Sequence, residues 1–230
     1  MLTRYGALIF AAGFAFFLFV LFAGQPLGAP PMTVGRAVLD QAPAAVGAAN
    51  IVTSVVLAYR GIDTMGELAI LFAASTAVGL VLGRGRGHAA PTAEPGGFIL
   101  QAGVDLLFPL LLVVGFYIIL HGHLTPGGGF QGGVVLAAAF VLPVLARPAE
   151  QPSHGAMAWV EGLAGTAFIV TGLAALAFDR AFLAPLLGAG QLGALVSAGT
   201  LPILYLAVGL KVGAELASLL LRFTEEEAAR

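Results

Sequence analysis

Long apolar runs separated by short polar stretches dominate the sequence. Each of the seven runs holds about 20 mostly apolar residues, the length that a helix needs to cross the hydrocarbon core of a bilayer. The runs are continuous rather than alternating, which excludes a membrane barrel. A segment that is not part of a closed barrel can pair all of its backbone N–H and C=O groups in lipid only by forming a helix. The expected spans are Tyr5–Ala23, Gln41–Tyr59, Thr64–Gly83, Phe98–Leu120, Phe130–Ala146, Ala158–Phe178 and Thr200–Leu221. The pattern predicts an all-α, polytopic membrane protein with about seven transmembrane helices.

The composition agrees with this pattern and excludes several classes of protein. Hydrophobic residues make up 59% of the 230 residues and charged residues only 10%, with a mean hydropathy of +0.99. Soluble domains carry about 25% charged residues, so a soluble enzyme or a disordered regulator is excluded. The 10 Lys and Arg residues are too scattered to form the basic patch that nucleic acid requires. Because Cys is absent, we expect no disulfide, no iron–sulfur cluster and no other cofactor.

Positive charges in the loops set the expected orientation, because cytoplasmic loops are enriched in Lys and Arg. An outside N-terminus places more arginines on the inner side than on the outer side. The inner set is Arg36, Arg84, Arg86, Arg147, Arg222 and Arg230, and the outer set is Arg4, Arg60 and Arg180. We therefore expect a multi-pass protein of the cell inner (plasma) membrane, with the N-terminus outside and the C-terminus in the cytoplasm.

The longest polar interruption lies between the third and fourth expected spans. This segment, Arg84–Gly97, is short and rich in Gly and Pro, which is typical of a linker. It predicts a three-helix module at 1–88 and a four-helix module at 98–230, joined by a linker at 89–97.

Ionisable residues within the expected spans are the main candidates for function. Each costs at least about 2.5–3.5 kcal/mol in a membrane and therefore needs a partner, water or a role. Lys211 lies near the middle of the last span, and Glu215 lies one turn further on the same face. The order Lys-then-Glu is the weaker one for helix stability, which favours transport or a proton relay. The alternative is a structural ion pair, or a Lys211 side chain that snorkels to the inner surface.

Asp105 lies about 7 residues into the fourth span, roughly 10 Å from the inner side. Glu215 is expected at a similar depth, roughly 9 Å, with Lys211 one turn deeper. This predicts that the fourth and seventh spans share one charged cluster. Alternatively, Asp105 caps a helix that begins later, near Leu106, while Phe98–Gly103 lies at the interface.

Further acidic residues lie near the expected starts of helices. Thr64 and Glu67 have the spacing of a capping box, and Arg60 and Asp63 could pair across the preceding turn. In a chain with so few charges, carboxylates beside the membrane also suit an ion or proton station, so Asp63 and Glu67 stay candidates. Glu161, about 3 residues into the sixth span, suits the helix dipole, and this structural role is the favoured one.

A glycine-rich turn at 121–133 joins the fourth and fifth spans. No strand precedes it and no Gly-Lys-Ser/Thr follows it, so nucleotide binding is not expected. Glycine permits positive φ and close helix approach, so we expect this turn to shape an outer vestibule. The residues expected to form it are Pro126, Gly127, Gly128, Gly129, Gly132 and Gly133.

His121 and His123 begin this turn. Two His at i and i+2 need further ligands to hold a metal, and His88 and His154 are expected across the membrane, so no metal site is predicted. His121 and His123 could titrate near neutral pH as parts of a proton path. The alternative is a pair of interface histidines that bond to the backbone.

Two segments carry a resemblance to a known family. YIILHGHLTPGGGFQGGVVLAAAFVL at 117–142 and SAGTLPILYLAVGLKVGAEL at 197–216 resemble the B-subunit (MnhB-type) domain of multisubunit Mrp cation/proton antiporters, over roughly 100–221. NIVTSVVLAYRGIDTMGE at 50–67 resembles a segment near the C-terminus of the large Mrp A subunit and a separate small subunit of membrane-bound hydrogenases. The chain thus resembles a fusion of two neighbouring modules.

The resemblance implies a non-catalytic membrane subunit in a hetero-oligomeric assembly related to the membrane arm of respiratory complex I. Its partners would be other Mrp-type subunits and the lipid bilayer, and the assembly would exchange protons for Na⁺ or another monovalent cation. The family's key acid corresponds to Glu67, its lysine to Lys211, and its histidine before the turn to His121 or His123.

Two other interpretations remain open from the sequence. The chain could belong to the membrane arm of an Mrp-related energy-converting redox complex, similar to a membrane-bound hydrogenase, without binding a redox centre itself. It could also be a scaffold bundle whose buried charges only fix the helix register. The chain departs from the family at Thr53, where Asn is common, and at Ala58, where an acid is common.

Overall fold

A computed structural model describes residues 2–24, 32–82, 94–149 and 152–228. All regular structure in these residues is helical, which confirms the predicted all-α class. The chain divides into two compact units, residues 1–37 and 38–230. The helices are α1 (Leu2–Ala23), α2 (Thr33–Val46), α3 (Ile51–Thr53), the π-helix η1 (Ser54–Tyr59), α4 (Gly61–Leu82), α5 (Phe98–Leu120), α6 (Gly129–Ala146), α7 (His154–Ala177) and α8 (Leu201–Ala228).

The first unit contains α1, which carries only apolar and small side chains from Tyr5 to Ala23, apart from the Tyr5 hydroxyl. Each of these side chains is exposed within the chain. A helix that is apolar on every face is stable when lipid or other membrane helices surround it. The predicted first span is therefore confirmed as a helix of membrane length.

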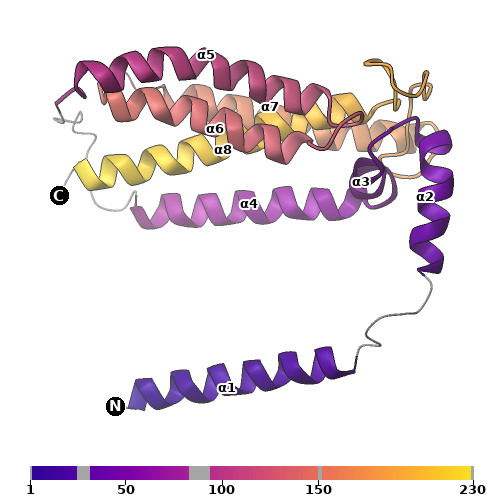
Figure 1. The fold of residues 1–230 in the computed structure, drawn as a ribbon, viewed down its shortest axis with the longest axis horizontal. Coiled ribbons are helices and arrows are strands. Elements are labelled where there is room, and N and C mark those ends of the chain that lie inside the picture. Colours follow the sequence, from indigo (N-terminus) through magenta and orange to yellow (C-terminus); the bar gives the residue numbers. More distant parts are fainter. Residues whose placement is uncertain (1, 25–31, 83–93, 150–151, 229–230) are drawn as a thin grey trace. The chain divides into compact units, whose positions relative to one another are not determined.

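The second unit is built around α5, α6, α7 and α8, with α4 running alongside α8 (Figure 1). The most buried helices of this unit are α6 and α8. In their apolar, membrane-length segments 44% and 56% of the residues are buried, against 6–22% in α4, α5 and α7. Ile119, Leu136, Leu204 and Val208 contribute to the core around these two helices. The outer faces of the unit are also apolar, as expected for helices that meet lipid or partner helices.

Six helices in the described part of the chain are long and apolar enough to cross a membrane, namely α1 and α4 to α8. They confirm six of the seven predicted spans. The starting residue of α7 is His154 rather than Ala158, and α8 continues to Ala228 rather than ending at Leu221. Gly83, the predicted end of the third span, lies outside the described residues, as do residues 84–88 of the first predicted module and residues 89–93 of the expected linker.

The predicted second span, Gln41–Tyr59, is wrong as a single straight helix. The chain leaves the helical path after Val46, and α2 meets the α3–η1 segment at an angle of 91°. Gly47 adopts φ +76°, a conformation that glycine accepts readily. Asn50 then starts α3 as its N-cap, with a side chain that accepts hydrogen bonds from Val52 N and Thr53 N. The pair counts as a seventh span only if both pieces cross the bilayer as one bent span.

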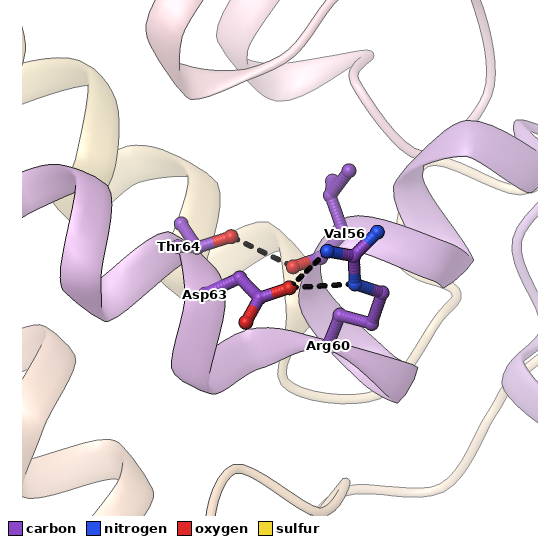
Figure 2. Close-up of polar contacts among 4 residues, drawn as sticks. All are labelled: Val56, Arg60, Asp63 and Thr64. Atoms are coloured by element: carbon purple, nitrogen blue, oxygen red, sulfur yellow. Dashed lines mark hydrogen bonds and ion pairs between the residues drawn. The ribbon is translucent and has the colours of Figure 1, made fainter. Parts of the chain in front are cut away.

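The junction of η1 and α4 is held by side-chain bonds (Figure 2). The Thr64 hydroxyl donates to the Val56 carbonyl at 2.7 Å, which satisfies one backbone acceptor in the π-helix. Arg60 Nε donates to Asp63 at 2.6 Å, so the predicted Arg60–Asp63 pair is confirmed. The predicted capping box is wrong, because α4 already begins at Gly61 and Thr64 lies inside the helix.

Two glycines at the start of α6 allow close contact with helices on both sides. A Cβ atom on Gly132 would lie 2.7 Å from the Gly115 carbonyl oxygen of α5. A Cβ atom on Gly133 would lie 2.8 Å from the Gly209 carbonyl oxygen of α8. These backbone atoms cannot move aside as a flexible side chain would, so glycine at both positions sets the spacing of α5, α6 and α8.

We expect Gly132→Ala to lower the free energy of unfolding by about 1–3 kcal/mol, because the added methyl group overpacks the α5–α6 contact. The matched control is Gly162→Ala on α7, where a Cβ atom meets nothing within 4 Å and alanine favours helix. Thermal unfolding of the two variants in the same detergent measures the difference. Equal melting temperatures for both variants would contradict the close packing described here.

Candidate functional site

A charged cluster lies inside the bundle at the α7–α8 contact. Lys211 Nζ donates to Glu215 Oε2 at 2.7 Å on the same helix face, as the i, i+4 spacing predicts. Glu161 Oε1 of α7 lies 3.6 Å from the same Nζ atom. The Glu215 side chain is fully buried, and the Lys211 and Glu161 side chains are 9% and 19% exposed. We call these three residues the charge cluster.

The surroundings of the charge cluster are largely apolar. Lys211 Nζ lies 5.3 Å from the centre of the Phe72 ring on α4, within the range of a cation–π contact. A Cβ atom on Gly165 of α7 would touch the Lys211 side-chain carbons at 3.6 Å. The second carboxylate oxygen of Glu215, Oε1, is buried without a hydrogen-bond partner. In such surroundings the ion pair is poorly screened, and an unpaired charge would be costly.

The position of Glu161 differs from the predicted one. Because α7 begins at His154, Glu161 lies seven residues into the helix rather than in its first turn. A role in the helix dipole is therefore wrong, and Glu161 joins Lys211 instead.

Asp105 does not complete this cluster as predicted. Its carboxylate is 61% exposed and accepts a hydrogen bond from Arg147 Nη2 at 2.5 Å. Arg147 is the C-cap residue of α6, so the pair links the start of α5 to the end of α6. The alternative that Asp105 caps a helix starting near Leu106 is also wrong, because α5 begins at Phe98.

A cavity of about 250 Å³ lies where η1, α4, α8 and the glycine-rich turn meet. Its polar lining includes Thr53, Thr64, Glu67, Gln131 and Tyr205. The rest of the lining is largely apolar, with Val52, Val56, Leu57 and Val208 among it, and the polar groups give water molecules in a space of this size hydrogen-bond partners. Its lining therefore combines Glu67, the candidate acid of the first module, with residues of the predicted vestibule.

The glycine-rich turn forms part of this cavity and is fixed by Asn50. Asn50 Nδ2 donates to the carbonyls of Gly122 at 2.8 Å and Thr125 at 2.9 Å. The Thr53 hydroxyl donates to the same Gly122 carbonyl at 2.6 Å. Gly128 adopts φ +143°, which glycine permits. Gly127, Gly128 and Gly129 line the cavity, and Pro126 is exposed.

Sequence reasoning missed three contributors to these sites, namely Asn50, Phe72 and Arg147. The signal for Asn50 was present, since Asn followed by an apolar run is a strong N-cap pattern. A phenylalanine in an apolar span carries no signal that sets it apart from its lipid-facing neighbours.

The two histidines of the turn differ in their surroundings. The His121 ring stacks on the Tyr117 ring, with centres 4.1 Å apart, and His121 Nδ1 lies 3.1 Å from the Tyr117 carbonyl. The His123 side chain is fully buried, and its Nε2 donates to the Ala194 carbonyl at 3.3 Å. No group of His, Asp and Glu within the described ranges could hold a metal.

Burial lowers the pKa of His123 below its ordinary value of 6.5. As the pH falls, His123 therefore binds a proton near pH 6.5 in the unfolded chain, whereas in the folded chain it binds this proton only at a lower pH. We expect stability to fall as the pH drops below 6.5, by at most about 1.4 kcal/mol per pH unit from this group, until the folded pKa is reached. Denaturant unfolding at several pH values should show this slope in the wild type and in His121→Gln, and lose it in His123→Gln. A slope that His123→Gln retains would assign the effect to other groups.

Comparison with known proteins assigns the family of this chain. Residues 99–218, just over half of the 230 residues, match the family described as a domain related to the MnhB subunit of Na⁺/H⁺ antiporter. The chain belongs to the MnhB family. The matched region contains α5 to α7 and most of α8, and therefore the whole charge cluster.

Three relatives of this MnhB-family chain are informative. An uncharacterized protein of Methanocaldococcus jannaschii is 31% identical over 197 residues, which is 74% of each chain. A chain in the solved structure of membrane-bound sulfane sulfur reductase, an archaeal respiratory membrane complex, is 38% identical with a TM-score of 0.79, and the match covers 97% of this chain and 98% of that one. A chain of the Mrp complex from Dietzia sp. is 27% identical with a TM-score of 0.73, covering 95% of this chain but only 26% of that one.

Proposed function

We propose that this chain is a non-catalytic membrane subunit of a multisubunit Mrp-type antiporter, which exchanges protons for Na⁺ or another monovalent cation. The observation that carries the proposal is the charge cluster, in which Lys211 lies between two carboxylates within a membrane-spanning bundle. Membership of the MnhB family and the likeness to a chain of the Mrp complex support it. The partners of the chain would be other subunits of such an assembly and the surrounding lipid.

The proposed path has two parts along the α4–α8 contact. Glu67 lies at the cavity beside the glycine-rich turn, and Val208 lines the same cavity one turn before Lys211 on α8. Ions or protons would enter through the cavity and reach the charge cluster by a short passage along α8. The other candidates of the path lie at its two ends. They are Asp63, His121 and His123 near the cavity, and Asp105 at the opposite end of the bundle.

The proposal includes two modules and an orientation. Residues 1–88 and 98–230 would be fused modules, supported by a family match confined to the second and by the longer Mrp chain that this one matches in part. The C-terminus would lie in the cytoplasm of a cell with the subunit in its inner (plasma) membrane. An outside N-terminus requires that α2, α3 and η1 cross the bilayer together, because six spans would place both termini on one side.

A second function has a specific observation in its favour. The likeness to the chain of the archaeal respiratory complex covers almost the full length of both chains at 38% identity. The chain could therefore serve the membrane arm of a redox complex rather than an antiporter. Identification of the proteins that co-purify with it decides between the two, because redox subunits support the second function and other Mrp-type subunits support the first.

We expect Glu67→Gln to reduce cation/proton exchange at least tenfold, because glutamine keeps the shape of the side chain but cannot carry a proton. Exchange is measured in inverted membrane vesicles that contain the assembled complex. Asp40→Asn, which removes an exposed carboxylate on α2, serves as the matched control and should leave exchange unchanged. Full activity of Glu67→Gln with normal assembly would remove Glu67 from the path.

A further inference from the structure

The charges of the cluster do not balance. One ammonium and two carboxylates give a net charge of −1 when Lys211, Glu161 and Glu215 are all ionised. Lys211 is the eleventh residue of Leu201–Thr224, the 24-residue part of α8 that is apolar enough to cross a membrane. Because this position is near the middle of the span, neither bulk water nor lipid headgroups screen the cluster well. An unbalanced buried charge costs several kcal/mol, and proteins avoid it by pairing or by taking up a proton.

Glu215 provides a second, independent observation. Its Oε2 accepts the hydrogen bond from Lys211, but its Oε1 is fully buried and has no partner. A buried carboxylate oxygen without a donor is rare in folded proteins, and such an oxygen takes a water molecule, an ion or a bound proton as its partner.

In the described residues, Lys211 is the one cation that forms the ion pairs with Glu161 and Glu215. Other basic residues of the two helices that carry the cluster are His154, at the first residue of α7, and Arg222 of α8, which lies beside Gly79. The α4 residue that contacts Lys211 is the uncharged Phe72. Glu67, which is also on α4, lines the cavity instead. On α5, Asp105 is paired with Arg147. Residues 129–146 of α6 contain no ionisable side chain, and the one ionisable residue of η1 is Tyr59, which is exposed.

We propose that the charge cluster of Glu161, Lys211 and Glu215 is a proton-binding site that holds one exchangeable proton, shared by the two carboxylates. A hydronium ion gives up the proton and becomes water, and the proton forms an O–H bond on one carboxylate oxygen, while Lys211 keeps its own proton. Glu161, the more exposed carboxylate, receives the proton first, and Glu215 Oε1 provides the buried position. This site deepens the proposed function and rests on it, because it assigns the proton of the exchange to named atoms.

The test counts protonated carboxyl groups by infrared spectroscopy of the full chain in lipid nanodiscs at neutral pH. The carbonyl band of a carboxylic acid shifts in D₂O and is compared among isotopically matched samples. The wild type should show a band equal to one carboxyl group above Glu161→Gln. Glu215→Gln should lose the band as well, because either variant leaves one ammonium facing one carboxylate. Lys211→Met should double the band, because two carboxylates then lack a cation.

Other results would overturn the proposal. A full band in Glu161→Gln would show a carboxyl group protonated by its own burial, without charge balance. A band that appears only when choline replaces Na⁺ would show that sodium balances the cluster. Asp40→Asn, which removes an exposed carboxylate on α2, is the control and should leave the band unchanged. If Lys211→Met fails to fold, the wild type and Glu161→Gln decide the question alone.

The same samples separate this inference from the proposed function. If the band behaves as expected but Glu161→Gln and Glu215→Gln retain full exchange in vesicles, the proton site stands and its role in exchange is wrong. If exchange is lost in both variants but the wild type has no band, the path stands and the proton site is wrong.

Discussion

Lys211→Ala should abolish cation/proton exchange in the assembled complex and also lower the stability of the subunit by about 3–5 kcal/mol. Alanine removes the only cation of the charge cluster and leaves Glu161 and Glu215 facing each other in an apolar bundle. Exchange is measured in inverted vesicles, and stability by unfolding in detergent micelles. Retention of full exchange by this variant would defeat the proposed path through the cluster.

A neutral triple variant separates charge from folding in this experiment. Lys211→Met combined with Glu161→Gln and Glu215→Gln removes all three charges and keeps the side chains at similar size. Replacing a buried ion pair with well-packed uncharged groups is often neutral for stability. The triple variant should therefore fold about as well as the wild type but remain inactive. If it exchanges ions normally, the cluster is only a scaffold that fixes the helix register.

Asn50→Ala should destabilise the fold by about 2–4 kcal/mol and lower exchange with it. The substitution removes the N-cap of α3 and leaves the carbonyls of Gly122 and Thr125 without this donor. Asn50 also holds the glycine-rich turn through its backbone, since Asn50 N donates to the His123 carbonyl at 3.0 Å. Differential scanning measurements in one detergent, together with the vesicle assay, would quantify both effects.

The matched control for Asn50 is Ser153→Ala. Ser153 caps α7 by accepting from Ala156 N at 3.1 Å, and that bond is exposed and local. Its loss should cost only about 1 kcal/mol, the usual value of a cap. An equal loss for the two variants would mean that the bonds of Asn50 to the turn add nothing beyond capping.

The membrane helices were predictable because length and apolarity alone decide which segments cross a bilayer. The predicted second span, Gln41–Tyr59, is the exception, because length and apolarity did not reveal its bend. Gly47–Asn50 is apolar enough to extend a hydropathy run, but Asn50 bonds to Gly122 and Thr125, more than 70 residues away. A local pattern contains no information about such partners, so the sharp bend was missed.

The site was predicted in part for a similar reason. The Lys211–Glu215 pair follows from helix geometry within one element, and the structure contains it. The third member of the cluster was assigned from depth to Asp105, whereas the structure places Glu161 there. Depth can be counted along a sequence, but the rotation of each helix depends on how it packs against its neighbours.

The aromatic ring over the lysine has a consequence for how the subunit is made. Phe72 belongs to α4 and Lys211 to α8, on opposite sides of the expected linker, yet the two side chains meet at 5.3 Å. A single gene product delivers both in a one-to-one ratio and at a high effective local concentration. If the two modules were separate polypeptides, they would have to associate in the bilayer before the Lys211 ammonium could contact the Phe72 ring.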